Sequence, residues 1–121
     1  MIRVLVVDDQ QLLRQGLCSL LALSDKVEVV GQANDGAEAR DWLQANADGV
    51  DVMLLDIRMP RMTGIELLNS LKQDGALLPT IMLTTFDDHE SLMGALSAGA
   101  KGYLLKDVSL ETLVDGIEAV H

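Results

Sequence analysis

The sequence repeatedly changes its hydrophobic period, and this alternation is the feature that most limits how the chain can fold. Short apolar runs rich in β-branched residues alternate with segments in which apolar residues recur every three or four positions. The runs lack strict polar alternation, which is typical of strands buried on both faces. The five predicted strands lie at Ile2–Val7, Val27–Val30, Val52–Leu55, Thr80–Leu83 and Tyr103–Leu105.

The segments between these runs have a helical period. Two of them carry clear apolar stripes on one helical face, and the segments at 37–45, 65–71 and 90–98 are weaker but helical in composition. The stripes comprise Leu13, Leu17, Leu20 and Leu21 in one segment, and Leu110, Leu113, Val114, Ile117 and Val120 in the other. A strand followed by a helix, five times over, predicts a parallel sheet with right-handed crossovers and helices on both faces.

Residues favoured at helix ends support these bounds. Asp35, Thr63 and Ser109 precede helical segments and are expected to cap their amino termini. Gly75 and Gly99 follow helical segments, where a glycine commonly ends a helix. The predicted elements fill the chain without a linker, a repeat or a low-complexity tract.

The acidic composition excludes several classes of partner. The 121 residues include nine Lys and Arg against nineteen Asp and Glu, for a net charge of −10. Nucleic-acid binding depends on clustered basic residues that neutralise phosphates, and the sequence has no such cluster. No apolar run approaches the roughly 18 residues of a membrane span, and the amino terminus does not resemble a signal peptide. We therefore expect one acidic domain located in the cytoplasm. The single Cys cannot form a disulfide within the chain, which fits this location.

Polar residues collect at one edge of the predicted sheet. In an open α/β sheet, ligands bind beyond the carboxyl ends of the strands. Asp8 and Asp9 follow the first strand, Asp56 follows the third, Thr84 follows the fourth, and Lys106 follows the fifth. Three carboxylates, a hydroxyl and an ammonium group are therefore expected at the same edge.

This set of groups suits a cation and a phosphoryl group. Three neighbouring carboxylates repel one another unless one is protonated or a cation joins them. Oxygen ligands favour Mg²⁺, which commonly binds one or two carboxylates, waters and a phosphate oxygen. A carboxylate can attack phosphorus to form an aspartyl phosphate, and catalysis would consist mainly of positioning and charge neutralisation.

Four segments resemble the receiver domain of two-component response regulators: VLVVDDQ, MLLDIRMPRMTGIEL, IMLTTFDD and AGAKGYLLKD. The resemblance covers essentially the whole chain, with the site positions in order. It implies the flavodoxin-like (βα)5 fold, a doubly wound parallel five-stranded sheet with strand order 2-1-3-4-5, which is known in receivers. That order makes the first and third strands neighbours and brings Asp8, Asp9 and Asp56 together.

The resemblance also implies a chemical role for each site residue. Asp56 accepts the phosphoryl group from a sensor histidine kinase or a small phosphodonor. Asp8, Asp9 and Asp56 bind Mg²⁺ or Mn²⁺ together with the backbone carbonyl of Arg58. Lys106 pairs with the phosphoryl oxygens. A domain of this kind catalyses only its own phosphorylation and dephosphorylation and is otherwise not an enzyme.

Further residues are implied to read out or time the modification. Thr84 bonds to the phosphoryl group in the active state, and Tyr103 is the aromatic residue that rotates inward behind it. Arg58 and Phe86 tune the access of water to the phosphoryl group, and their bulk favours slow hydrolysis. Lys106 is followed by Asp107, where many receivers have proline.

The segments DDQQLLRQGLCSLL, LTTFDD and KGYLLKD are most similar to the NarL/LuxR-type subfamily, although Gln10 stands where many members have His. In that subfamily a helix-turn-helix DNA-binding domain follows the receiver. The resemblance implies that residues 1–121 are a receiver and that DNA is bound only by an output domain not in this chain. Dimers would form through the first and fifth helices, or through the fourth helix, fifth strand and fifth helix. The alternative is a stand-alone receiver acting through protein–protein contacts.

Simpler interpretations stand beside these. Asp8 and Asp9 are also suited to capping the first helix, and Tyr103 is also suited to filling the core. A phosphatase that forms aspartyl phosphate usually has the pattern D-x-D after its first strand, whereas here Asp8 and Asp9 are adjacent. Neither glycine-rich nucleotide-binding motif occurs. An interaction module that is never phosphorylated would be expected to lack at least one of the site residues.

Overall fold

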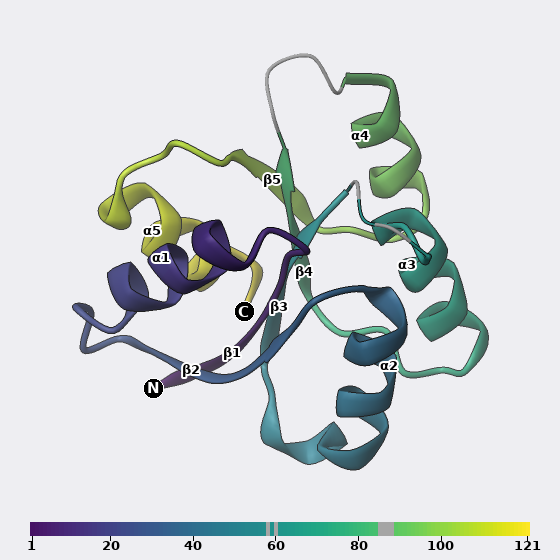
Figure 1. Cartoon of the computed structure of the whole chain (residues 1–121), viewed down its shortest axis with the longest axis horizontal. Coiled ribbons are helices and arrows are strands. Elements are labelled where there is room, and N and C mark those ends of the chain that lie inside the picture. Colours follow the sequence, from purple (N-terminus) through teal and green to yellow (C-terminus); the bar gives the residue numbers. More distant parts are fainter. Residues whose placement is uncertain (58, 60, 85–88) are drawn as a thin grey trace.

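The five predicted strands form one parallel sheet in the computed structural model, which describes residues 1–57, 59, 61–84 and 89–121. The strand order is β2-β1-β3-β4-β5, as the flavodoxin-like prediction requires (Figure 1). The strands are β1 (Ile2–Val7), β2 (Val27–Ala33), β3 (Val52–Asp56), β4 (Thr80–Thr84) and β5 (Gly102–Leu105).

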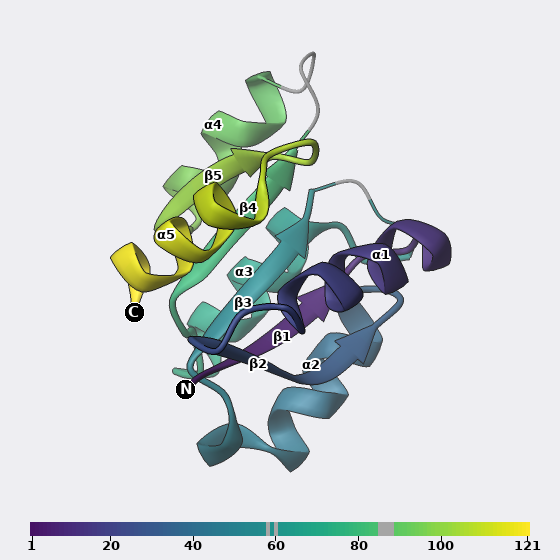
Figure 2. The ribbon, with the colours of Figure 1, turned by 90° about the vertical axis from the view of Figure 1, so that its left-hand side faces the viewer.

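Helices cover both faces of this sheet, which confirms the doubly wound arrangement. On one face lie α1 (Gln11–Leu21) and α5 (Leu110–Val120), which Figure 2 shows in front of the strands. On the other face lie α2 (Gly36–Ala45), α3 (Gly64–Gln73) and α4 (His89–Ser97), with a short 3-10 turn at Ala47–Gly49 after α2. Within the described residues, no helix has the length and apolar character that crossing a membrane requires.

The sheet is buried because each central strand contributes to two apolar layers. Successive side chains of a strand point to opposite faces. In β1, Val4 and Val6 pack in the layer beneath α1 and α5, whereas Leu5 and Val7 pack in the layer beneath α2, α3 and α4. All four are completely inaccessible to solvent. This explains why the predicted strands read as continuous apolar runs.

Strand β2 is longer than its apolar run predicted, because it continues through Gly31 and Gln32 to Ala33. Its pairing with β1 shifts register between Val4 and Leu5, and the ladder then resumes. Main-chain pairing extends the strand even though these residues lack the apolar character of a strand. In the described part of the chain, β2 lies at the edge of the sheet and pairs with β1 alone.

The helix ends follow the predicted chemistry. The side chains of Asp35, Thr63 and Ser109 each accept a hydrogen bond from the main-chain N–H three residues later, and Thr63 forms a complete capping box with Glu66. Gly75 and Gly99 have positive φ angles of 68° and 115° after α3 and α4. Local residue chemistry therefore fixes where these helices begin and end.

Gly64, the first residue of α3, permits a close approach between that helix and the end of β3. A Cβ atom placed on Gly64 would lie 2.6 Å from the backbone oxygen of Asp56 and 3.2 Å from the Cα of Ile57. Both obstacles are main chain and cannot move as a flexible side chain would. Gly16, in the middle of α1, has no heavy atom within 4 Å of the equivalent position.

We therefore expect opposite effects from alanine at the two glycines. Gly64→Ala should lower the free energy of unfolding by about 1–3 kcal/mol, because it overpacks a rigid contact. Gly16→Ala should raise it by about 0.5–1 kcal/mol, because alanine favours a helix interior. Urea unfolding of both variants measures these changes. Equal effects of the two substitutions would contradict the contact at Gly64.

Candidate cation-binding site

Three carboxylates meet at the carboxyl end of the sheet. Asp8 follows β1 and Asp56 ends β3, and these strands are paired neighbours. Asp8, Asp9 and Asp56 each offer an oxygen atom, and the three oxygens lie within 4.8 Å of one another. Asp8 and Asp56 are buried, whereas Asp9 is exposed. The structure thus brings together the three acidic residues that the sequence predicted.

Asp8 is completely inaccessible to solvent, and only one of its two carboxylate oxygens accepts a hydrogen bond from the residues that the structure describes. Its Oδ1 accepts a hydrogen bond of 2.9 Å from the main-chain N–H of Gln10. Its Oδ2 is buried and has no hydrogen-bond partner. The interpretation of Asp8 and Asp9 as caps of α1 is wrong, because Gln10 is the N-cap residue and no side chain caps that helix. A buried carboxylate oxygen without a partner marks a place for a ligand.

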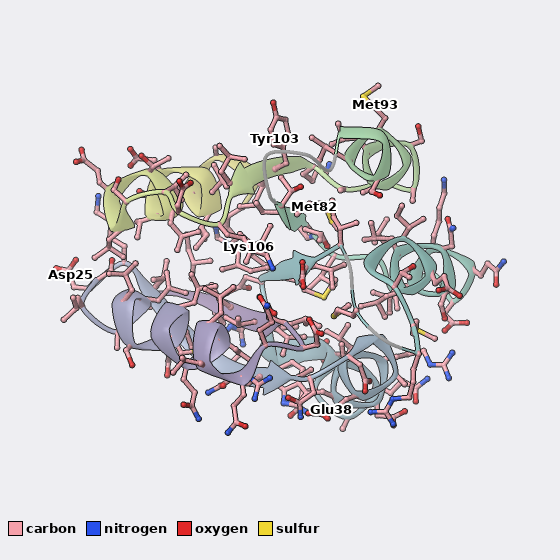
Figure 3. The ribbon with its side chains drawn as sticks, turned by 45° about the horizontal axis from the view of Figure 1, so that its top comes forward. Asp25, Glu38, Met82, Met93, Tyr103 and Lys106 are labelled. Atoms are coloured by element: carbon pink, nitrogen blue, oxygen red, sulfur yellow. The ribbon has the colours of Figure 1, made fainter. Side chains whose placement is uncertain are left out.

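Lys106 supplies a positive charge to this cluster. Its Nζ lies 3.1 Å from Oδ1 of Asp56 and 3.6 Å from Oδ2 of Asp8, so the second contact is an ion pair but too long for a hydrogen bond. Figure 3 shows the Lys106 side chain directed toward the middle of the site. One ammonium group facing three carboxylates leaves the cluster negative when all three are ionised.

Thr84 lies beside Lys106 at the end of β4. It is 3% exposed, and its backbone oxygen accepts a hydrogen bond of 3.0 Å from the N–H of Lys106. The Lys106–Asp107 peptide is trans, as are the other peptide bonds in the described ranges. The structure therefore places Thr84 and Lys106 on adjacent strand ends, next to Asp56.

The site perturbs the ionisation of Asp56. Burial raises the pKa of this carboxyl group to about 6, because the charged form loses hydration, and the negative charge of Asp8 adds to the effect. The nearby Lys106 ammonium opposes this shift without cancelling it. Any cation that enters the cluster would further favour the ionised form of Asp56.

The donor set fits a hard divalent cation such as Mg²⁺. The three residues that could hold it, Asp8, Asp9 and Asp56, provide carboxylate oxygens, which such ions prefer over nitrogen or sulfur. The Oδ2 of Asp8, which has no hydrogen-bond partner, and the negative balance of the cluster both favour a cation there. Arg58, whose backbone carbonyl is the fourth predicted ligand, lies outside the described residues.

Of the predicted site residues Tyr103 and Phe86, only Tyr103 lies in the part of the chain that the structure describes. Tyr103 lies on β5 opposite Met82 and is 52% exposed, so it does not fill the core. In Figure 3 its side chain points away from Lys106, toward the surface that also carries Met93. Phe86, like Arg58, lies outside the part of the chain that the structure describes.

Arg14 is a residue of this region that the sequence did not reveal. It lies in α1, is only 8% exposed, and donates a hydrogen bond of 2.7 Å from Nη1 to the backbone oxygen of Asp8. Arg14 is seven residues before Leu21, so both lie on the buried face of the helix. The signal in the sequence that could have revealed Arg14 is the spacing that places this charged residue on the apolar face of its helix.

A second unforeseen contact joins two loops near the site. Arg61 donates to Oδ2 of Asp35, whose Oδ1 accepts the N–H of Glu38 at the start of α2. Arg61 has a positive φ angle of 68°, which is unusual for a residue with a side chain. These residues are 26 positions apart, and no local pattern marks their pairing.

Comparison with known proteins agrees with this architecture. The family model described as "Response regulator receiver domain" matches residues 4–118. A solved structure, the signal receiver domain of the putative response regulator NarL from Mycobacterium tuberculosis, superposes with a TM-score of 0.88 at 36% identity, covering 98% of this chain and 94% of that one.

Curated relatives show how much of a longer protein the chain matches. The nitrate/nitrite response regulator protein NarP of Escherichia coli strain K12 is 44% identical over 97% of this chain and 54% of its own length. The transcriptional regulatory protein DesR of Bacillus subtilis strain 168 is 42% identical over 99% of this chain and 58% of its own length. The chain therefore spans about half the length of these relatives.

The raised pKa of Asp56 predicts a stability effect in the absence of divalent cations. An unfolded aspartate has a pKa of about 4. Between about pH 4 and 6 the folded state keeps a proton that the unfolded state releases, so the free energy of unfolding falls as the pH rises through this window. Asp56→Asn removes this cost and should stabilise the fold near pH 7.5 by up to about 3 kcal/mol. The gain should fade toward pH 4.

Urea unfolding in a chelator at a series of pH values measures this difference. Asp41→Asn, which changes an exposed aspartate on α2, provides the control: it retains Asp56, so its stability should still fall between about pH 4 and 6 as that of the unmodified protein does. The burial of a charged Asp56 would be contradicted if Asp56→Asn were no more stable than the unmodified protein near pH 7.5.

Proposed function

Because the chain belongs to the response regulator receiver domain family, we propose that it is a phosphorylation-activated switch in which Asp56 accepts a phosphoryl group from a sensor histidine kinase. The observation that carries this assignment is that buried Asp56 lies in a cluster of three carboxylates and forms an ion pair with Lys106, which also contacts Asp8. The chain is also similar to NarL/LuxR-type regulators, as NarP, DesR and the NarL receiver illustrate.

The proposed reaction is an in-line transfer to a carboxylate oxygen. An oxygen of ionised Asp56 forms a bond to phosphorus while the bond between phosphorus and the donor nitrogen breaks, and that electron pair leaves with the imidazole. The Lys106 ammonium faces the phosphoryl oxygens and balances part of their charge. Mg²⁺, or Mn²⁺, held by Asp8, Asp9, Asp56 and the Arg58 carbonyl would neutralise further charge on the phosphoryl group.

We further propose that Thr84 and Tyr103 read out the modification. Thr84 ends β4 directly beside the site, and Tyr103 lies on the neighbouring strand β5 with an exposed side chain. A phosphoryl group on Asp56 would accept a hydrogen bond from the Thr84 hydroxyl and so draw the end of β4 toward Asp56. This movement would leave space for Tyr103 to turn inward. The surface around β5 and α4 would then change when Asp56 is modified.

The signal is proposed to reach an output domain outside this chain. NarP and DesR are regulators about twice as long as the matched region, and a helix-turn-helix domain following the receiver would account for transcriptional control. Any DNA contact is assigned to that domain, since this chain has a net charge of −10. We propose a cytoplasmic protein whose own reactions are phosphorylation and dephosphorylation of Asp56. A stand-alone receiver acting through protein contacts is the alternative.

Two surfaces are candidates for a homodimer. Leu12 in the first turn of α1 is 84% exposed, and Leu23, just after that helix, is 76% exposed; α1 packs beside α5. Met93 of α4 and Tyr103 of β5 are 54% and 52% exposed on the other candidate face. Each surface therefore presents large apolar side chains, as interaction sites often do.

Phosphorylation of Asp56 is tested directly with a small phosphodonor. Incubation of the protein with acetyl phosphate and Mg²⁺ should add one phosphoryl group, detected as a mass increase by intact-protein mass spectrometry. Asp56→Asn should abolish the increase, and Asp41→Asn should not, because Asp41 is an exposed residue on α2. Undiminished labelling of Asp56→Asn would overturn the assignment.

The lifetime of the phosphorylated form tests the proposed roles of Arg58 and Phe86. The double variant Arg58→Ala with Phe86→Ala should lose its phosphoryl group faster than the unmodified protein, because smaller side chains admit water to the phosphorus. The decay of the labelled mass after removal of the donor measures the rate. An unchanged rate would remove both residues from the proposal.

A further inference from the structure

Arg14 ties together three segments at the cation-binding site. Its Nε donates to the Gln32 side chain on β2 at 3.1 Å, and its Nη1 donates to the backbone oxygen of Asp8 at 2.7 Å. The same Nη1 donates to the side-chain oxygen of Asn34, after β2. One guanidinium group on α1 therefore joins the ends of β1 and β2 to the segment that leads into α2.

The charged side chain of Arg14 is largely buried. The three acceptors are a backbone carbonyl and two side-chain amides, and none of them is ionised. Removing a guanidinium group from water is costly unless hydrogen bonds replace its hydration, and Arg14 has three acceptors that do so. One of the three bonds leads to the residue of the site that is completely buried, Asp8. A hydrogen bond from a charged donor is shorter and stronger than a neutral one.

Asp8 is held at every polar atom except one. Its N–H donates to the backbone oxygen of Ala33 at 3.1 Å, and its Oδ1 accepts from Gln10. Its backbone oxygen accepts from Arg14, which leaves only Oδ2 without a hydrogen-bond partner. The contacts of Asp8 with its own surroundings therefore fix the direction in which Oδ2 points.

We propose that Arg14 is a positioning residue that fixes the main chain of Asp8 and so keeps its Oδ2 directed at the cation. The inference rests on the proposed function of the acidic cluster as a cation site. Groups that orient metal ligands through hydrogen bonds typically contribute 10–100-fold to metal affinity. Arg14 makes no direct contact with the cation in this account and acts only through Asp8.

The positive charge of Arg14 and its hydrogen bonds would change the affinity for the cation in opposite directions. If only its positive charge mattered, Arg14 would repel a second cation, and removing it would strengthen cation binding. If its hydrogen bonds set the direction of Asp8, removing them weakens binding even when the charge is retained. Lysine retains the charge but lacks the rigid fork that spans several acceptors. Two substitutions at this position therefore separate the two effects.

The test measures Mn²⁺ binding to the unphosphorylated protein, from the loss of the electron paramagnetic resonance signal of free Mn²⁺. Arg14→Gln should bind Mn²⁺ about tenfold more weakly than the unmodified protein. Arg14→Lys should bind it at least threefold more weakly. Circular dichroism restricts the comparison to folded protein, and Arg14→Lys serves if Arg14→Gln does not fold.

Arg40→Gln is the matched control. Arg40 is a partly buried arginine that donates to the Ser70 hydroxyl at 3.2 Å and joins α2 to α3, away from Asp8. Its loss should reduce stability but leave Mn²⁺ affinity unchanged. An equal loss of affinity in Arg40→Gln would reduce the effect at Arg14 to general destabilisation and overturn the proposal.

The remaining outcomes are equally decisive. Affinity within threefold of the unmodified protein in both Arg14 variants, or tighter binding by Arg14→Gln, would overturn the positioning role while leaving the cation site intact. Failure of the unmodified protein itself to bind Mn²⁺ would instead overturn the cation site, and with it the proposed function.

Discussion

The repulsion among three carboxylates at one sheet edge is the interaction on which the rest of the site depends. Asp8 and Asp56 are buried at the ends of adjacent strands, where their charged forms lose hydration. Lys106 lies within ion-pair distance of both, yet the pKa of Asp56 still rises to about 6. The repulsion among the carboxylates is thus only partly compensated by Lys106. Further positive charge in the cluster would reduce it. A cation and a phosphoryl group are complementary additions to such a site, because each compensates the charge of the other.

The fold provides the rigidity that such a site needs. The central strands β1, β3 and β4 are fixed by an apolar layer on both faces, and β5 pairs with β4, so the side chains at these strand ends keep their separations. Hydrogen bonds then refine the positions of single groups. Gln10 and Arg14 constrain Asp8, and the backbone oxygen of Thr84 constrains Lys106. Catalysis by positioning requires this order more than it requires an unusual chemical group.

The sequence was sufficient to predict most of the fold and the members of the acidic cluster, because their signals are local. Apolar runs mark the strands, and the polar residue that follows each run, such as Asp56, must lie at the ligand-binding edge. Arg14 and the Arg61–Asp35 pair were not predicted, because their partners are distant in the chain and are brought close only by packing. The exposure of Tyr103 was also not predictable, since a β5 residue near the sheet edge can face either way.

We propose that the acidic cluster binds a divalent cation and that Asp56 carries a phosphoryl group beside this cation. A crystal structure of the chain with Mg²⁺ and beryllofluoride, a mimic of the phosphoryl group, tests it most directly. We predict beryllium on an oxygen of Asp56, Mg²⁺ bound to Asp8, Asp9 and Asp56, and the Lys106 ammonium group against a fluorine atom. Density for the mimic at any other residue, or a cluster that stays free of both additions at saturating concentrations, would contradict the account.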